Sequence, residues 1–250
     1  MSETKIKTSS AGPIMTLTFT AESGVNVLSS ATLHHLDEAV RRVGQDAGVR
    51  VCVFTGEGKV FLAGADIKEM SVFDAEAARR HGQLGADAFD AIAALPCVTV
   101  AALNGAAMGG GLELALACDF RLAVRTARVG LPEVTLGLIP GWKGLHRLTA
   151  LVGPAKARRL IFSGEGIKAE DAATLGLVDE AVNSVEDLQH RVEAFAKLFF
   201  AAGPQAVASA KRALRDGDDL TAFAECFLDH ADGHEGMKAF IEKRKPRWAI

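Results

Sequence analysis

Hydrophobic positions in the first half of the chain follow two different periods. Residues 14–19 alternate between apolar and polar side chains, which predicts a half-buried strand. In residues 33–43 the apolar positions recur at spacings of three and four, the pattern of one face of an amphipathic helix. The apolar runs 49–54 and 97–103 contain β-branched residues and predict buried strands.

The elements that follow keep alternating between helix and strand. Residues 74–95 are rich in alanine and predict a long helix, which Pro96 ends. Residues 112–118 predict a shorter helix, residues 120–124 predict a further buried strand, and Asp66 is the expected N-cap of another helix. Short apolar strands alternating with helices indicate an α/β fold with right-handed crossovers.

The pattern changes after Pro132, because helical periods dominate the rest of the chain. The stretches that predict helices are 145–163, 168–175, 185–201, 204–215 and 219–243. We therefore expect an α/β core over residues 1–195 and a helical region over residues 196–250. The helical region is expected to pack on the core or on a neighbouring subunit.

Composition limits the class of protein. The chain has 250 residues, of which 49% are hydrophobic and 24% charged, values that fit a globular protein with a sizeable core. Lys and Arg number 28 against 31 Asp and Glu, so the net charge of −3 offers no basic surplus for a nucleic-acid partner. One dense basic run, residues 243–247, is either a solvated tail or a phosphate contact.

The cysteines and the terminal sequence predict a cytoplasmic protein. The four cysteines are widely spaced without a CxxC pair, so they are interpreted as buried small hydrophobes in a reducing compartment. The first five residues are polar and do not resemble a signal peptide. The longest apolar stretch, residues 91–118, is interrupted by Pro96, Asn104 and Glu113, so we expect no membrane span.

The chain contains no tyrosine. No phenol is therefore present to act as a general acid, a nucleophile or an oxyanion donor. This excludes the Tyr/Lys mechanism of many nicotinamide-dependent reductases.

Three consecutive glycines, residues 109–111, lie between a predicted strand and a predicted helix. Glycine permits close backbone approach, and the start of a helix leaves N–H groups free. The segment therefore suits an anion that develops during a reaction. A tight strand–helix crossing that needs small residues is the alternative. The sequence lacks the Gly-Lys-Ser/Thr of a phosphate-binding P-loop and the full context of a dinucleotide site.

Two carboxylates stand in apolar surroundings close to this segment. Glu113 falls in the first turn of the predicted helix, and Glu133 follows Pro132. A buried carboxylate is costly unless it is partnered or partly protonated, so the pair suggests general acid/base chemistry on a carbonyl compound. For Glu113 the alternative is a favourable place on the helix dipole. Spacing alone does not show that the two side chains converge.

Other constellations are weaker. His230 and His234 stand four positions apart, but Gly233 interrupts them, and a polar helix junction is the better interpretation. His146 is a lone histidine, more often structural than catalytic. No metal site is expected.

Several segments, in series along essentially the whole chain, resemble the enoyl-CoA hydratase/isomerase (crotonase) family. They are Ala63-Gly64-Ala65-Asp66-Ile67-Lys68-Glu69-Met70, the stretch 101–119 with its glycines and Glu113, Leu131-Pro132-Glu133-Val134 followed by Gly137-Leu138-Ile139-Pro140-Gly141, and residues 235–244.

The resemblance implies a fold, a substrate class and a mechanism. The family fold is an α/β core of repeated ββα units in a spiral, with a C-terminal α-helical trimerisation region. Family members bind an acyl-CoA thioester, whose oxygen is held by the backbone N–H groups at the positions of Ala65 and Gly110. In hydratases, the carboxylates at Glu113 and Glu133 hold a water. One takes its proton as it attacks C3 and the other delivers a proton to C2. The backbone of Gly141 helps to place that water.

The resemblance also implies contacts with coenzyme A. The positions concerned are Ala63, Asp66, Ile67, Lys68 and Lys243, the last acting from a neighbouring subunit. A basic residue that often meets a CoA phosphate in the family is replaced here by Ser23. The basic residues Lys68 and Lys243 are expected to compensate.

A second departure lies in the loop that follows Gly141. The family has small residues where this chain has Trp142 and Lys143. Either both side chains point away from the site, with Trp142 packing on a loop or trimer surface, or Trp142 reshapes the acyl pocket.

The expected function is that of an enoyl-CoA hydratase, which adds water to a trans-2-enoyl-CoA to give a 3-hydroxyacyl-CoA through an oxyanion-stabilised enolate. The alternatives are a Δ3,Δ2-enoyl-CoA isomerase and a non-catalytic acyl-CoA-binding relative. No cofactor is expected, because coenzyme A is part of the substrate. The expected partners are the acyl-CoA and further copies of the chain, as a trimer or a dimer of trimers.

Overall fold

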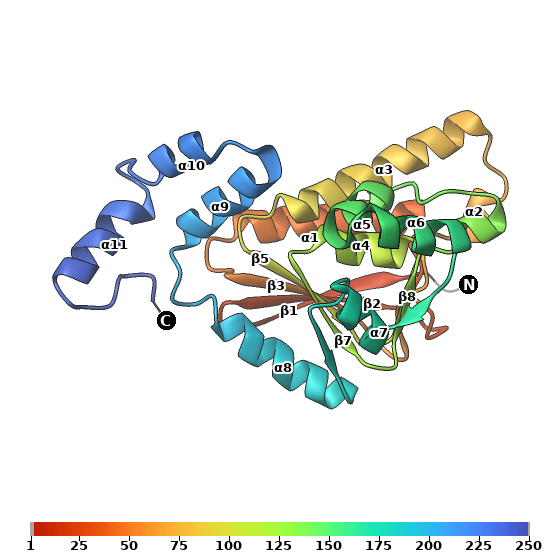
Figure 1. Cartoon of the computed structure of the whole chain (residues 1–250), viewed down its shortest axis with the longest axis horizontal. Helices are drawn as coiled ribbons and strands as arrows, with labels where there is room; N and C mark the ends of the chain where they lie inside the picture. Colours follow the sequence, from red (N-terminus) through yellow and green to blue (C-terminus); the bar gives the residue numbers. More distant parts are fainter. Residues whose placement is uncertain (1–2, 250) are drawn as a thin grey trace.

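The computed structural model describes residues 3–249 (Figure 1). Met1 and Ser2, part of the polar terminal stretch noted above, and Ile250 lie outside the described residues. The strands are β1 (Lys5–Ala11), β2 (Ile14–Thr20), β3 (Val51–Gly56), β4 (Val60–Leu62), β5 (Val98–Leu103), β6 (Ala106–Met108), β7 (Phe120–Val124), β8 (Arg128–Gly130), β9 (Ile167–Lys168) and β10 (Glu180–Val182).

Helices cover the strands and make up most of the C-terminal part of the chain. They are α1 (Ser30–Gln45), α2 (Ile67–Met70), α3 (Ala75–Ala93), α4 (Gly110–Ala117), the 3₁₀ helix η1 (Glu133–Leu136), α5 (Gly144–Val152), α6 (Pro154–Ser163), α7 (Ala169–Leu175), α8 (Val185–Lys197), α9 (Pro204–Asp216), α10 (Asp219–Glu225) and α11 (Asp232–Ile241). Within the described residues, no helix is both long enough and apolar enough to cross a membrane.

The described strands form two sheets, and the chain winds between them. The larger sheet has the order β1-β2-β3-β5-β7-β10, and the smaller has the order β4-β6-β8-β9. Each of the pairs β3/β4, β5/β6 and β7/β8 gives one strand to each sheet before a helical segment follows. Strands from successive turns of this winding pair in parallel, as crossover connections require. The expected spiral of repeated ββα units is confirmed.

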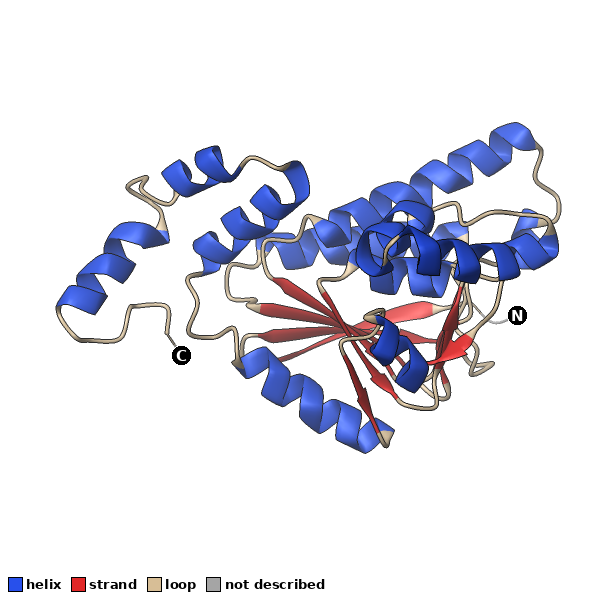
Figure 2. Ribbon diagram, viewed as in Figure 1, coloured by secondary structure: helices blue, strands red, loops and turns tan. Residues whose placement is uncertain are grey.

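The core lies between the larger sheet and the helices α1, α3 and α4, with α8 on the opposite face of the sheet (Figure 2). Phe54 of β3, Phe61 of β4 and Phe89 of α3 are completely buried. The strands β3 and β5 are covered on both faces, which explains their continuous apolar sequences.

The helices α9, α10 and α11 extend beyond one end of the larger sheet (Figure 1). Two cations, one buried and one largely buried, attach this group to the core. Lys211 of α9 donates to the carboxylate of Asp119 at 2.6 Å and to the carbonyl of Cys97 at 2.7 Å. Arg50, next to β3, donates to the carbonyls of Ala202 and Trp248. The division of the chain at residues 195 and 196 stays a prediction.

Most elements agree with the hydrophobic pattern, with two corrections. The predicted helix 145–163 is two helices, because Gly153 adopts a left-handed φ of 81° and Pro154 starts a new helix. The predicted helix 219–243 is broken after Cys226, where the carbonyl of that residue accepts from the N–H of Gly233.

Candidate active site

The glycine segment forms a sharp turn between β6 and α4. Gly109 has φ 52° and ψ −125°, a conformation open to glycine but strained for other residues. A Cβ there would also lie 2.8 Å from Oε1 of Glu133. The turn therefore serves two purposes: it aims the N-terminus of α4, and it lets a carboxylate approach the backbone.

The backbone at Ala65 lies beside this turn. Ala65 forms a parallel bridge with Leu28, in which Leu28 donates to the carbonyl of Gly64 and accepts from the N–H of Asp66. The N–H of Ala65 therefore points away from Leu28. A Cβ on Gly64 would lie 3.6 Å from the nitrogen of Gly110, so the two backbone segments are in contact. Gly110, as the first residue of α4, has an N–H without an intrahelical acceptor.

Glu113 is almost completely buried, with 2% of its surface exposed. Its Oε1 accepts from the backbone N–H groups of Trp142 and Gly144, each at 2.8 Å. Burial raises its pKa to about 7, against the lowering effect of the two N–H donors, and the charge of Glu133 raises the pKa further. The carboxylate can therefore exchange a proton near neutral pH.

Glu133 faces Glu113 from the start of η1. Pro132 precedes it, and Met108 of β6 pairs with Gly130 of β8, so the ends of neighbouring strands bring the two carboxylates together. Burial raises the pKa of Glu133 as well. Within the described residues, its buried Oε2 has no hydrogen-bond partner. A buried oxygen of this kind favours the protonated carboxyl.

Both carboxylates line one cavity of about 350 Å³. Its other walls are mostly apolar and come from α2, α3, the start of α4 and the loop after η1. The lining residues are Ala63, Gly64, Ala65, Ile67, Met70, Phe73, Ala78, His81, Gly82, Gly109, Gly110, Glu113, Pro132, Glu133, Leu136, Leu138, Ile139, Gly141 and Trp142.

The side chains of Trp142 and Lys143 point in different directions. Trp142 is buried and lines the cavity, with its ring edge-to-face against Phe89 and its Nε1 donating to the carbonyl of His81. Lys143 points away and pairs with Asp90 of α3. The interpretation that both side chains avoid the cavity is therefore wrong for Trp142 and correct for Lys143.

The residues expected to contact coenzyme A are only partly assembled. Ala63 and Ile67 line the cavity, and Lys68 is exposed on α2 beside it. Asp66 caps α2 as expected, accepting from the N–H of Lys68 at 2.9 Å. Lys243 follows α11, which lies at the other end of the molecule from α2 (Figure 1).

Sequence reasoning missed His81, which lines the cavity from α3. Its Nδ1 lies 3.0 Å from the hydroxyl of Ser30, and its ring lies between those of Phe73 and Trp142. Burial lowers its pKa, which favours the neutral imidazole. A histidine on the buried face of an alanine-rich helix was the available signal.

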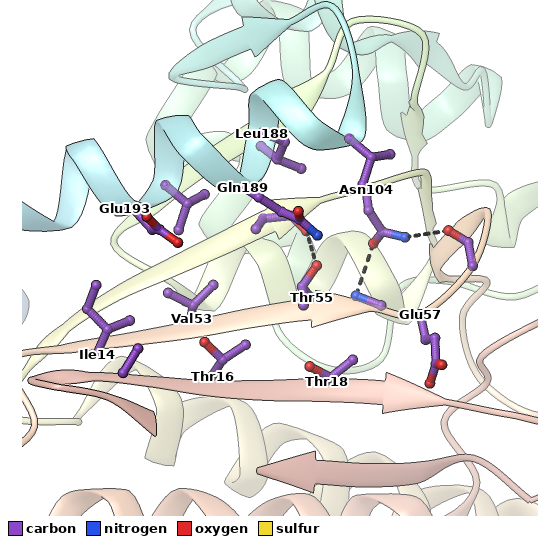
Figure 3. Close-up of a pocket in the computed structure, with 16 residues that line it drawn as sticks. Ile14, Thr16, Thr18, Val53, Thr55, Glu57, Asn104, Leu188, Gln189 and Glu193 are labelled. Carbon is purple, nitrogen blue, oxygen red and sulfur yellow. Dashed lines mark hydrogen bonds between the residues drawn. The ribbon is translucent and has the colours of Figure 1, made fainter. Parts of the chain in front are cut away.

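A second cavity, of about 420 Å³, lies between the larger sheet and α8 (Figure 3). The polar side chain of Asn104 lines this cavity, but its hydrogen bonds are already made within the protein. The Asn104 side chain accepts from the N–H of Gly56 and donates to the carbonyl of Gly58, each at 3.0 Å. Glu57, at the rim, pairs with Lys7. These contacts hold the β3–β4 turn against β5 and do not form an acid/base pair.

The remaining candidates are structural. Cys52, Cys97 and Cys118 are buried, and burial raises the pKa of each thiol. No group of three or more His, Cys, Asp or Glu side chains in residues 3–249 is arranged to hold a metal. In the basic run, Arg244 pairs with Glu235 at 2.7 Å, so part of its charge is neutralised within the chain.

Comparison with known proteins agrees with this geometry. The family model described as enoyl-CoA hydratase/isomerase matches residues 9–249. The crotonyl-CoA hydratase of Syntrophomonas wolfei is 40% identical over 232 residues, covering 88% of each chain. The short-chain-enoyl-CoA hydratase of Clostridium acetobutylicum is 38% identical and covers 94% of this chain and 93% of its own.

Solved structures give the same answer. The crystal structure of the enoyl-CoA hydratase from Bacillus anthracis matches with a TM-score of 0.88 and 35% identity, over 99% of both chains. The family match covers nearly the whole sequence, and the relatives cover it at well over 30% identity. The chain belongs to the enoyl-CoA hydratase/isomerase family.

Proposed function

We propose that this protein is an enoyl-CoA hydratase, which adds water to a trans-2-enoyl-CoA thioester and forms a 3-hydroxyacyl-CoA. One observation carries the proposal: Glu113 and Glu133 line one largely apolar cavity, beside the backbone N–H groups of Ala65 and Gly110. Named hydratases at 38–40% identity over most of the chain support it.

The N–H groups of Ala65 and Gly110 supply the electrostatic part of the mechanism. In the proposed complex they donate to the thioester oxygen. Attack of water at C3 moves negative charge onto this oxygen as the enolate forms. Fixed donors favour that state over the ground state, and the dipole at the N-terminus of α4 acts in the same direction.

The carboxylates divide the proton transfers. Glu113 accepts two N–H donors on Oε1, which favours its anion, so we assign it the proton from the attacking water. Glu133 has a buried oxygen without a donor, which favours the acid, so we assign it delivery of a proton to C2. Gly141 is exposed and lines the same cavity, and its backbone would position the water.

Hydration is favoured over isomerisation because both carboxylates face the cavity. A Δ3,Δ2-isomerase moves one proton and can work with a single carboxylate, whereas hydration must hold a water and handle two protons. The test is the conjugated absorbance of crotonyl-CoA, which disappears on hydration, while a 3-enoyl-CoA gains it on isomerisation. We expect loss with crotonyl-CoA. Binding of CoA thioesters without either reaction would support a non-catalytic protein instead.

For coenzyme A, we propose contacts with Ala63, Ile67 and Lys68 from one subunit. Asp66 contributes by holding the turn of α2. Lys243 would reach the nucleotide only from a neighbouring subunit, given where α11 lies. Exchange of Lys243 for Ala is expected to raise KM for crotonyl-CoA and leave kcat unchanged.

We propose a homo-oligomer, as a trimer or a dimer of trimers, and the exposed apolar side chains of the C-terminal helices support this proposal. Leu214, Leu220 and Phe240 are 88%, 83% and 86% exposed in the single chain. Such surface is normally covered by another subunit. Light scattering on the purified protein should give three or six copies. Phe240→Asp should reduce that number, and Val185→Asp on α8 should leave it unchanged.

A further inference from the structure

The position of the Glu113 carboxylate depends on a short loop. Both of its hydrogen bonds on Oε1 come from backbone N–H groups of residues 142 and 144. Gly144 is also tight against it, since a Cβ there would lie 2.5 Å from Cγ of Glu113. A shift of this loop therefore moves the carboxylate or removes its donors.

The loop is held in a conformation that its sequence does not favour. Lys143 has φ 70°, in the left-handed region, and serves as the N-cap of α5 without a side-chain capping bond. A residue with a Cβ costs about 1 kcal/mol or more in this region, so contacts elsewhere must impose the conformation.

Those contacts converge on one carboxylate of α3. Asp90 pairs with Nζ of Lys143 and, through Oδ1, with the guanidinium of Arg147 at 2.7 Å. Arg147 also donates to the carbonyl of Trp142 at 3.0 Å. Asp90 thus fixes the loop on both sides of Gly144, the residue whose N–H binds Glu113.

We propose that Asp90 is a positioning residue for Glu113: it acts through Lys143 and Arg147 on the backbone that holds the carboxylate. The inference rests on the proposed function for its kinetic effect but not for its structural one. It concerns a residue outside the cavity wall, on a helix surface where its side chain is 44% exposed.

The charges around the two acids set the sign of the expected pH effect. Glu113 faces Glu133, whose charge raises its pKa, and Arg147, whose charge lowers it. Asp90 faces Lys143 and Arg147, and its charge also acts on Arg215 of α9. If Asp90 acted on Glu113 only by its charge, its removal would lower the pKa of Glu113. If it holds the N–H donors in place, its removal raises that pKa.

The experiment compares Asp90→Ala, Asp90→Asn and Asp90→Glu in the full-length protein. The matched control is Glu76→Ala, which breaks an exposed ion pair with Arg80 on the same helix. With crotonyl-CoA, Asp90→Ala should lower kcat about tenfold with KM little changed. It should also move the acid limb of the pH profile to higher pH. Asp90→Glu should restore most of the rate, and Asp90→Asn, which keeps the hydrogen-bond acceptor, should fall between. Melting curves verify that each variant is folded, and Asp90→Asn carries the test should the alanine variant not fold.

A second measurement does not need activity. The carboxyl of Glu113, labelled with ¹³C and assigned by its absence in Glu113→Gln, should titrate near pH 7 and shift upward in Asp90→Ala. An unchanged or lowered titration, or a kinetic loss equal to that of Glu76→Ala, would overturn the proposal. If the unaltered protein does not hydrate crotonyl-CoA but the titration still shifts upward, the proposed function fails and the positioning role stands.

Discussion

The indole of Trp142 occupies a slot that exists because residue 85 is glycine. A Cβ at Gly85 would lie 2.2 Å from Nε1 of Trp142, and one at Gly110 would lie 2.1 Å from the far edge of the same ring. The wall of the cavity, helix α3 and the start of α4 are therefore fitted around one side chain.

The first prediction concerns Gly85→Ala. Alanine normally stabilises a helix interior by up to about 1 kcal/mol relative to glycine. Here the added methyl collides with Trp142, so we expect a loss of about 1–3 kcal/mol and a lower melting temperature. Gly82→Ala, one turn earlier on α3, is the control, because a Cβ there meets nothing within 4 Å. Equal changes in the free energy of unfolding for the two variants would show that the indole does not depend on glycine at position 85.

The rate of hydration should depend on the ionisation of Glu113. As the proposed base it must be a carboxylate, and its pKa lies at about 7. We expect kcat/KM to rise with pH through an acid limb centred near pH 7. Glu113→Gln and Glu133→Gln should each reduce the rate at least about a hundredfold. Full activity in either variant would contradict the two-carboxylate mechanism.

The same pKa predicts that the folded protein loses stability over the pH range in which its activity rises. The pKa of Glu113 is about 7 in the folded protein and 4.5 without the fold, so the protonated form favours folding. This contribution is complete below pH 4.5 and is lost as the pH rises through 7. Glu113→Gln removes the dependence, and its free energy of unfolding at pH 8 should exceed that of the parent by up to roughly 3 kcal/mol. Denaturant unfolding at pH 4 and pH 8 measures the difference, which should be small at pH 4.

The left-handed conformation at Lys143 can be tested by two substitutions that both remove its ion pair with Asp90. Glycine tolerates φ 70° without strain and alanine does not. We therefore expect Lys143→Gly to be about 1 kcal/mol more stable than Lys143→Ala. In an exposed helix the order is reversed, so a more stable alanine variant would argue against this backbone conformation.

Lys211 should contribute to the docking of α9. Its ammonium, largely buried, meets a carboxylate of Asp119 that also accepts from Thr99. Lys211→Met should cost about 2 kcal/mol and increase proteolysis of the C-terminal helices. The exposed pair formed by Arg215 and Asp216 on the same helix provides the control, since Arg215→Met should cost less than about 1 kcal/mol.

The sequence was sufficient for the long elements and insufficient for the short ones. Buried strands such as β3 and β5 carry continuous apolar runs, which are visible without a partner. The strands β4, β6 and β8 have three residues each, which is too few to show a hydrophobic period. They form because the neighbouring strands of the smaller sheet offer hydrogen-bond partners. For the same reason, the pattern did not reveal that the chain alternates between two sheets.

For the site, the sequence supplied the residue types but not their contacts. Glu113 and Glu133 were recognisable as carboxylates in apolar surroundings, yet their convergence depends on the pairing of β6 with β8. Asp90 carries no local signal, because its importance comes from Lys143 and Arg147, which lie far along the chain. The left-handed backbone at Lys143, directly after the buried Trp142, is a feature that no composition argument predicts.

The winding of the chain has a consequence for how this protein can change over evolutionary time. Glu113 and Glu133 stand just after neighbouring strands of the smaller sheet, outside its hydrogen-bonded ladder. Residues at these exits can be exchanged without disturbing the pairing that makes the scaffold stable. A single substitution just after one of these strands can therefore change the chemistry of the site while the framework of the fold stays the same.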